Sequence, residues 1–396
     1  MSPPRYVNCC RHRWLSIAML SALVGIGALK WLPAEEPNPA KIAAQGAVST
    51  ISAPEVPVTY QVQQVVTLSD IPPNSQLVRL WVAIPGDESN QKLLDFSVKS
   101  CPGKWTVVGD AERRGKFLQI EISKPSVAEL SVDTAFTIRR DPVYVNLGEG
   151  QSGLLTDGLK SLLAEHLNRA APHMEVTESL QKMADEICGK EQNIVKQAAL
   201  LLQHVASTVD HYSYSSNPEM PSCGIGDAAV CLKQGGGCCT DLNSLFISLA
   251  RARGIPARLQ MGYRLQPKNL GKLVDPGYRC WVEYFVPNYG WVSADIVEAD
   301  TPGGLGPKRW FTGLTARRIW LNQGREFKLA SDQAVERVNH MSIAYAEIDG
   351  KPARLLPTGK LKAQITRKVL FTEIAPVASA VAPSRAIPTN PVSAGR

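Results

Sequence analysis

The feature that most constrains this chain of 396 residues is the segment GGGCCTDLNSLFISLARARGIPAR, residues 235–258. Its apolar side chains recur at the i, i+3, i+4, i+7 spacing of one helix face, at Leu242, Leu245, Phe246 and Leu249. Gly254 suits the position just past a helix end, and Pro256 cannot continue a helix. The segment therefore predicts a helix that begins near Cys239, directly after three glycines.

A thiol at the start of this helix has the setting of a reactive nucleophile. Cys239 would face unpaired backbone N–H groups and the positive end of the helix dipole, and both favour the thiolate. The same N–H groups can bind an oxyanion, and the glycines let a substrate approach the backbone closely. The simpler interpretation is that Cys238 and Cys239 are small buried apolar residues or disulfide partners, because free cysteine is among the most buried residue types.

A second segment, RCWVEYFVPNYGWVSADI at residues 279–296, predicts a β-hairpin. Two strand-like runs flank the turn PNYG, in which Pro287 and Gly290 stand at suitable positions. The hairpin carries Asp295 back toward the start of the first strand. Counting along the strands leaves Asp295 three residues from the position opposite Arg279, which is about 10 Å at ~3.3 Å per residue. A bulge or a looser turn would shorten that gap.

Together the two segments resemble the core of the transglutaminase-like superfamily. The resemblance is carried by the glycine-rich lead, the C-x-D motif of Cys239 and Asp241, and the runs LFISLARARGIPARLQMGYRL and CWVEYFVPNYGWVSADIVEAD. LWVAIPGDESNQKLLDFSV and NQGREFKLASDQAVERVNHMSIAYAEIDGKP are similar to the leading β domain and the ending of a bacterial exported subgroup, so the resemblance spans roughly residues 57–355. It implies a papain-like fold and a group that includes transglutaminases, peptidases and amide-cleaving enzymes.

The resemblance also implies roles for individual residues. Cys239 is the expected nucleophile, because Asp241 follows at the family's C-x-D spacing, and Asp295 is the expected acid that orients the base. The base belongs two residues before Trp281, in the family's H-x-W, but this chain has Arg279 there. The family's amide acyl transfer or hydrolysis through a cysteine thioester needs an imidazole that takes and returns a proton. Guanidinium stays protonated at any relevant pH, so we expect these reactions to be impaired.

Other interpretations of the site remain open. Arg279 could pair with Asp295 through a bidentate contact, or stabilise a thiolate at Cys239 by its charge. An active cysteine peptidase or transglutaminase-like enzyme would need another proton carrier, for which His211 and His340 are the candidates. A protein without enzymatic activity would be a cell-envelope peptide-binding module in which Arg279 binds an acidic group. In each case the expected partner is a protein or peptide, as substrate or as ligand.

The N-terminus predicts export. Three arginines within the first thirteen residues precede an uncharged apolar run, Leu15–Leu29, which is the layout of a secretory signal. The run is short for a membrane span, which needs about 20 residues, although Lys30 and its neighbours would extend it. We therefore expect residues 1–32 to be a signal peptide or a membrane anchor. The expected location is the periplasm or cell envelope, and the segment could also hold the protein at the membrane.

The rest of the chain divides by composition and pattern, and the expected fold class is α+β. Residues 33–55, rich in Pro, Ala and Glu, are expected to form a linker. Residues 56–147 contain several short alternating strands, which predict an antiparallel β-sandwich domain. Residues 150–372 begin with helical patterns and continue into the transglutaminase-like core, a central helix packed on an antiparallel sheet, with further strands at the end. Residues 373–396, rich in Ala, Pro and Ser, predict a disordered tail.

Charge and cysteine content narrow the expected partners. The net charge of +7 is scattered and forms no basic stripe with interleaved aromatic residues, so we expect no nucleic-acid partner. Seven of the nine cysteines follow the apolar segment, an odd number that leaves at least one unpaired, while others can form disulfides after export. Their spacing does not match a structural zinc site, and no carboxylate-rich loop suits calcium. We expect neither a metal nor a cofactor.

Overall fold

The computed structural model describes residues 56–147, 152–220, 225–301, 306–355 and 360–374. The predicted signal or anchor, the predicted linker and the predicted tail after Ile374 lie outside these residues. Within the described ranges, no helix is long and apolar enough to cross a membrane.

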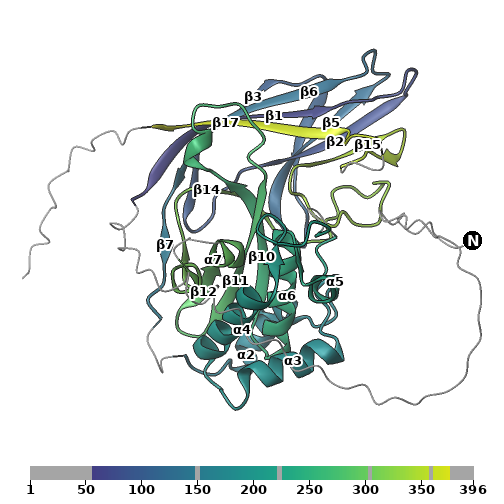
Figure 1. Ribbon diagram of the computed structural model, residues 1–396. Helices are drawn as coiled ribbons and strands as arrows, with labels where there is room; N and C mark the ends of the chain where they lie inside the picture. Colours follow the sequence, from purple (N-terminus) through teal and green to yellow (C-terminus); the bar gives the residue numbers. More distant parts are fainter. Residues whose placement is uncertain (1–55, 148–151, 221–224, 302–305, 356–359, 375–396) are drawn as a thin grey trace, which may run out of the picture.

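Two antiparallel sheets dominate the fold (Figure 1). The smaller sheet has four described strands, in the order β17 (Ile365–Ile374), β1 (Val58–Leu68), β6 (Leu130–Arg140) and β3 (Gln91–Ser100). The larger sheet is ordered β12 (Gly290–Ala294), β11 (Tyr278–Val286), β10 (Ala257–Arg264), β14 (Arg318–Gln323), β5 (Arg114–Ser123), β2 (Leu77–Ile84), β15 (Ala344–Ile348) and β16 (Lys351–Pro352), and β4 (Lys104–Val108) also pairs with β5. Alternating segments such as VTYQVQQVVTL in β1 form these strands because every second side chain turns inward.

Apolar side chains fill the space between the two sheets. The smaller sheet and the β5–β2–β15 part of the larger sheet share one buried cluster, which includes Val66, Val132, Ile365, Leu80, Ile120 and Ala346. The strands of residues 56–147 thus share both sheets with β15 and β17 from the last part of the chain. Strand β14 continues the larger sheet from β5 into β10. The predicted division of the chain at residue 147 stays a prediction, because described strands from both sides of it pair in the same two sheets.

Most of the helices gather around one end of the larger sheet (Figure 1). Three of them, α3 (Glu178–Cys188), α4 (Ile194–Thr208) and α5 (Ala228–Gln234), pack against α6 (Cys239–Ala252), which itself packs on β10 and β11. Every residue of α6 is buried, not only the apolar face that the sequence predicts. The shorter helices are α2 (Asp157–Leu162), η1 (Ala164–Leu167), η2 (Pro267–Asn269), α7 (Ile296–Asp300) and α8 (Pro307–Trp310). The fold is therefore mixed α and β with large antiparallel sheets.

The end of α6 follows its sequence signal. Gly254 has a φ of 71° just past the helix, and its N–H donates to the Arg251 carbonyl at 3.0 Å. The N–H of Ile255 donates to the Ala250 carbonyl at 2.9 Å, which completes a Schellman motif. The buried Arg251 guanidinium donates to three backbone carbonyls, those of His166, Asn168 and Ala257. These bonds fix the C-terminal end of the helix, and with it the position of its N-terminal end.

Two short pairings complete the framework. Strand β7 (Val143–Tyr144) pairs with β13 (Gly313–Leu314). Strand β8 (Asp210–His211) runs parallel to β9 (Gly236–Gly237), directly before α6, and its register sets His211 opposite Gly237. The second pairing brings a histidine from a distant segment to the start of the central helix.

Candidate active site

The start of α6 is held by the carboxylate of the C-x-D motif. Cys239 is the first residue of the helix and Cys238 is its N-cap. Asp241 accepts a hydrogen bond from the Cys238 N–H at 2.9 Å through Oδ2, and one from the Asp227 N–H at 3.2 Å through Oδ1. The aspartate therefore joins the loop before α5 to the loop before α6, and it fixes the backbone beside the expected nucleophile.

Gly236 and Gly237, before the helix, lie so close to other parts of the protein that a side chain would not fit at either position. A Cβ on Gly236 would lie 2.0 Å from the Asp210 carbonyl oxygen of β8, and a Cβ on Gly237 would lie 2.7 Å from Asp241 Oδ2. Both contacts are far too short for a side chain. The sequence interpretation gave these glycines to a closely approaching substrate, whereas the close approach that the structure contains is made by β8 and by Asp241.

The hairpin of β11 and β12 has a shorter offset than counting predicted. Val282 pairs with Ala294, so the same register continued by one residue sets Trp281 opposite Asp295. Asp295 is therefore two residues from the position opposite Arg279, not three, because a three-residue loop joins Val286 to Gly290. An even offset puts Arg279 and Asp295 on the same face of the sheet.

Asp295 lies in a buried cluster of charges and has a different direct partner from the one expected. Arg318 Nη1 on β14 lies 2.7 Å from Asp295 Oδ2, although the two atoms are not aligned as a hydrogen bond. Arg264 Nε on β10 lies 2.5 Å from Glu298 Oε1, and Arg279 Nη2 lies 3.9 Å from the same oxygen. Burial alone would raise the pKa of Asp295, but the guanidinium of Arg318, and then that of Arg279, lower it below the usual value. Asp295 is therefore a carboxylate at neutral pH.

The Cys239 thiol is more basic than its place at a helix start predicted. Its hydrogen bond with Cys238 lowers the pKa, but a hydrogen bond with Cys280 and burial together raise it by more. The pKa of Cys239 therefore lies well above the usual thiol value. The charge of Arg279 lowers this pKa as well, without reversing the result. The expectation of a stabilised thiolate is therefore wrong: Cys239 rests as a thiol, because the buried neighbouring thiols favour the protonated form.

The cysteines of the described residues are all free, so none of the disulfides that export would allow is present among them: Cys101, Cys188, Cys231, Cys238, Cys239 and Cys280. Two hydroxyl groups contact the thiols around the helix start. Tyr278 Oη lies 3.3 Å from Cys238 Sγ, and Thr240 Oγ1 lies 3.3 Å from Cys280 Sγ. Cys223 lies outside the described residues.

The two candidate histidines lie near the helix start, but neither is hydrogen-bonded to the Cys239 sulfur in the described part of the chain. His211 accepts a hydrogen bond from the Ser213 N–H through Nδ1 at 3.4 Å. Burial, and then the charge of Arg279, lower its pKa to about 4. The ring of His340 stacks on Tyr278 with centroids 6.0 Å apart, and burial lowers its pKa to about 4 as well. Both rings are therefore neutral at pH 7.

Sequence reasoning placed Cys239, Arg279 and Asp295 at one site but missed the residue that holds Asp295. The charge of Arg279 acts on both Cys239 and Asp295, so these three groups lie within electrostatic reach of each other. Arg318 is almost fully buried in a strand that is otherwise largely apolar. The sequence offered one indication of a role for Arg318, a charged residue within an expected strand, and this did not predict its pairing with Asp295.

Residues 181–296 match the sequence profile of the transglutaminase-like superfamily. The chain contains a transglutaminase-like domain. This match confirms the resemblance that the sequence motifs indicated, and it includes the segments that carry Cys239, Arg279 and Asp295.

Two further comparisons extend beyond this domain. An uncharacterized protein of Haemophilus influenzae is 29% identical over 236 residues, which is 51% of this chain and 62% of that relative's length. A crystal structure from Cytophaga hutchinsonii, provisionally assigned as a cysteine protease, superposes with a TM-score of 0.52 at 17% identity. That likeness covers 81% of this chain and 91% of the other, and at this identity it shows a shared fold alone.

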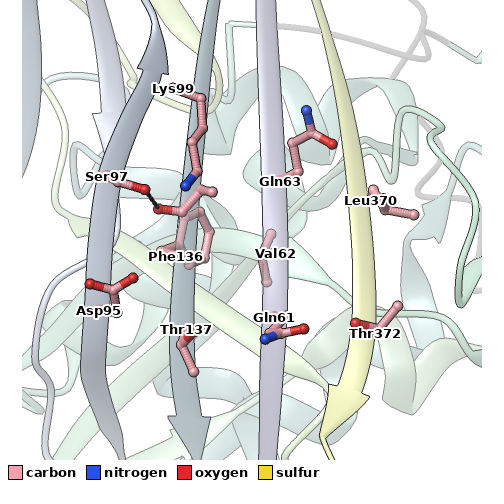
Figure 2. A pocket seen from close by; sticks show the side chains of 11 residues that line it. Gln61, Val62, Gln63, Asp95, Ser97, Lys99, Phe136, Thr137, Leu370 and Thr372 are labelled. Atoms are coloured by element: carbon pink, nitrogen blue, oxygen red, sulfur yellow. Dashed lines mark hydrogen bonds between the residues drawn. The ribbon is translucent and has the colours of Figure 1, made fainter.

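A separate cavity of about 310 Å³ lies on the four-stranded sheet (Figure 2). Its lining comes from β1, β3, β6 and β17 and is mostly polar, with Gln61, Gln63, Asp95, Ser97, Lys99 and Thr137 among the side chains. None of the residues around Cys239 contributes to it.

Proposed function

We propose that this transglutaminase-like protein engages protein or peptide amides at Cys239 but transfers or hydrolyses their acyl groups poorly. The observation that supports the proposal most is Arg279, a buried guanidinium in the position where the reaction needs an imidazole. Burial lowers the pKa of Arg279, but the charges of Asp295 and Glu298 raise it more, so that it lies above its already high usual value. Arg279 therefore stays protonated and cannot accept a proton.

Two proton transfers make this replacement costly. The Cys239 thiol must lose a proton to attack the amide carbon, and the leaving amine must gain one. The raised pKa of Cys239 leaves little thiolate at neutral pH. Asp295 is ionised but lies against Arg318, so its carboxylate is already engaged. We therefore expect slow turnover even where a substrate is well bound.

An active enzyme that uses His211 is the second candidate. His211 lies beside Gly237, and a pKa of about 4 leaves its ring neutral at pH 7, as a general base must be. Its Nδ1 faces the Ser213 N–H at 3.4 Å, and among the described residues neither ring nitrogen is hydrogen-bonded to the Cys239 sulfur, so we rank this candidate second.

If turnover is absent and not merely slow, the first proposal becomes a peptide-binding module without enzymatic activity. Export or anchoring through residues 1–32 would place such a module in the periplasm or cell envelope, and the sequence alone supports this location. The expected partner remains a protein or peptide.

Arg279→His is the direct test. We expect hydrolysis of casein, or incorporation of a fluorescent amine into it, to rise about 10²–10⁴-fold over the parent, the usual contribution of general acid–base catalysis. Arg279→Lys is the matched control, because it keeps a cation and adds no imidazole, and the gain must vanish in Arg279→His combined with Cys239→Ala. If the parent is already as active as Arg279→His, the proposal fails. Loss of that activity in His211→Gln would then favour the second candidate.

A further inference from the structure

We infer that the site beside Cys239 recognises a carboxylate group of its ligand through the Arg279 guanidinium. The inference rests on the proposed function, because it takes Arg279 as a binding group that has replaced a catalytic base.

Three guanidinium groups, two of them buried, pair with only two carboxylates in this cluster. Arg264, Arg279 and Arg318 come from three strands of the larger sheet. Their ion pairs join them to Asp295 and Glu298 at the start of α7. Three positive groups against two negative groups leave one positive charge among these five groups; water solvates part of Arg264, which is 31% exposed, whereas Arg279 and Arg318 are buried. A buried charge without a counter-charge is costly, and a bound anion would remove that cost.

Arg279 is the cation whose own partners are most distant. Arg264 holds Glu298 through both Nε and Nη2, at 2.5 and 2.9 Å, and Arg318 lies 2.7 Å from Asp295. The ion pair of Arg279 with Glu298 is 3.9 Å long, and among the described residues its buried Nη1 has no hydrogen-bond partner. The geometry therefore leaves one buried guanidinium donor without a partner, which a ligand could supply.

The other groups on which the charge of Arg279 acts most strongly are not carboxylates. The charge of Arg279 acts on Cys239 and His211, but Cys239 keeps its proton and His211 is neutral. Tyr214, which Arg279 also reaches, accepts a hydrogen bond from Thr301 Oγ1 at 3.3 Å. The Arg279 side chain keeps 10% of its surface exposed, so a ligand can reach part of it, and the buried Nη1 must turn outward to meet that ligand.

A carboxylate is the group that fits this donor. Its two oxygens match the planar fork of a guanidinium, and such charge-assisted pairs are stronger than neutral hydrogen bonds. In a peptide the carboxylate can be the chain terminus or the side chain of an acidic residue, and both present the same two oxygens to Arg279.

Three small probes separate these sources. N-acetylalanine carries a terminal carboxylate, N-acetylglutamate α-amide carries a side-chain carboxylate, and N-acetylglutamine α-amide is the neutral isostere of the second probe. Each is titrated into the full chain by calorimetry, with thermal unfolding as a second readout. We expect at least one acid to bind about tenfold or more tightly than the neutral probe, as for a hydrogen bond between charged groups.

Variants assign that preference to Arg279. Arg279→Gln should remove it, and Arg279→Lys should keep part of it, because lysine offers a point charge without the fork. Arg139→Gln is the matched control, since this arginine lies on β6, a strand of the other sheet, is 53% exposed and pairs with Asp141. A parent that binds acid and neutral probe equally overturns the inference, as does an Arg279→Gln variant that keeps the preference.

The same titrations separate this inference from the proposed function. Should Arg279→Gln fail to fold, the acid-against-amide comparison in the unaltered chain still decides the inference. Repeating that comparison in Cys239→Ala measures binding without turnover. High turnover in the parent would refute the proposed function, even if the parent still bound the acids more tightly than the amide. Equal binding of acid and amide would refute the inference, whatever the turnover.

Discussion

At position 279 a guanidinium stands where the family resemblance predicts an imidazole, and the contacts of the neighbouring acids do not require a catalytic base. Asp295, which would orient an imidazole, lies against Arg318 and caps α7 by accepting the Glu298 N–H at 3.0 Å. Its carboxylate thus has an electrostatic and a structural partner that do not depend on catalysis. Asp241 likewise serves the backbone around the helix start. The retained acids are therefore explained by the stability of the site without any assumption of turnover.

Cys239 itself gives a prediction about pH. Because its folded pKa lies well above the usual thiol value, alkylation by iodoacetamide should be slow at neutral pH and accelerate as pH rises. By linkage, a thiol pKa raised in the folded state stabilises the protein below the unfolded pKa, and this stability is lost as pH rises above it. Peptide mass mapping measures the rate, with the half-buried Cys101 as internal reference. Alkylation of Cys239 that is fast at pH 7 and faster than that of Cys101 would contradict the raised pKa.

The sequence could predict individual site residues only where a short local motif contains them. The C-x-D spacing predicts Cys239 as the nucleophile, and the position two residues before Trp281 predicts that Arg279 replaces a histidine; both stay predictions. The pairing of Arg318 with Asp295 joins strand β14 to the residue that follows β12. These strands are separated in the sheet by β10 and β11, and no spacing in the sequence encodes the pairing. The high pKa of Cys239 was missed for the same reason, since it depends on burial and on Cys280, which lies on strand β11 and not on α6.

The pairing of β8 with β9 is the element that positions His211, and glycine makes it possible. Gly236→Ala would set a Cβ 2.0 Å from the Asp210 carbonyl oxygen, at a φ of 152°. We expect β8 to detach, with faster hydrogen exchange at the Tyr212 amide, which donates to Gly237 in the parent. Gly235→Ala is the matched control: it has a φ of 70° but open space, so it should cost only about 1–2 kcal/mol of left-handed strain. Equal exchange in the two variants would mean that β8 does not depend on this contact.

At the element scale, helix ends and the hairpin could be predicted because their signals are local. The start of α6 at Cys239 and its Schellman end at Gly254 both follow from short motifs. The hairpin was predicted with an offset one residue too long, because the turn residues did not reveal the three-residue loop with Asn288 at a φ of 72°. Turn geometry sets strand register, so a small error in the turn moves the whole of the returning strand.

At the scale of the whole molecule, the last part of the chain returns to its beginning. Strand β17 forms one edge of the smaller sheet by pairing with β1 along its length, and β15 pairs with β2 in the larger sheet. Periodicity predicted strands in both places, but it could not predict that they pair across hundreds of residues. Arg367 of β17 adds a buried tie, because its guanidinium bonds Asp275 at 2.5 Å and the Ser342 carbonyl at 3.0 Å. These pairings join the strands before residue 147 to those near the C-terminal end of the described chain.

Truncation tests whether these strands fold as one unit. A chain that ends at residue 364 loses β17, and with it the buried side chains of Ile365, Val369 and Phe371. Burying each is worth about 1.5–3 kcal/mol. Domains are stable by only about 5–15 kcal/mol, so we expect this chain to lose its cooperative thermal transition. A chain that ends at Ile374 keeps every described contact of β17 and should melt close to the parent. A helical core that still melts cooperatively in the shorter chain would instead support the division at residue 147, because it would show that the transglutaminase-like part is stable without the completed sheets.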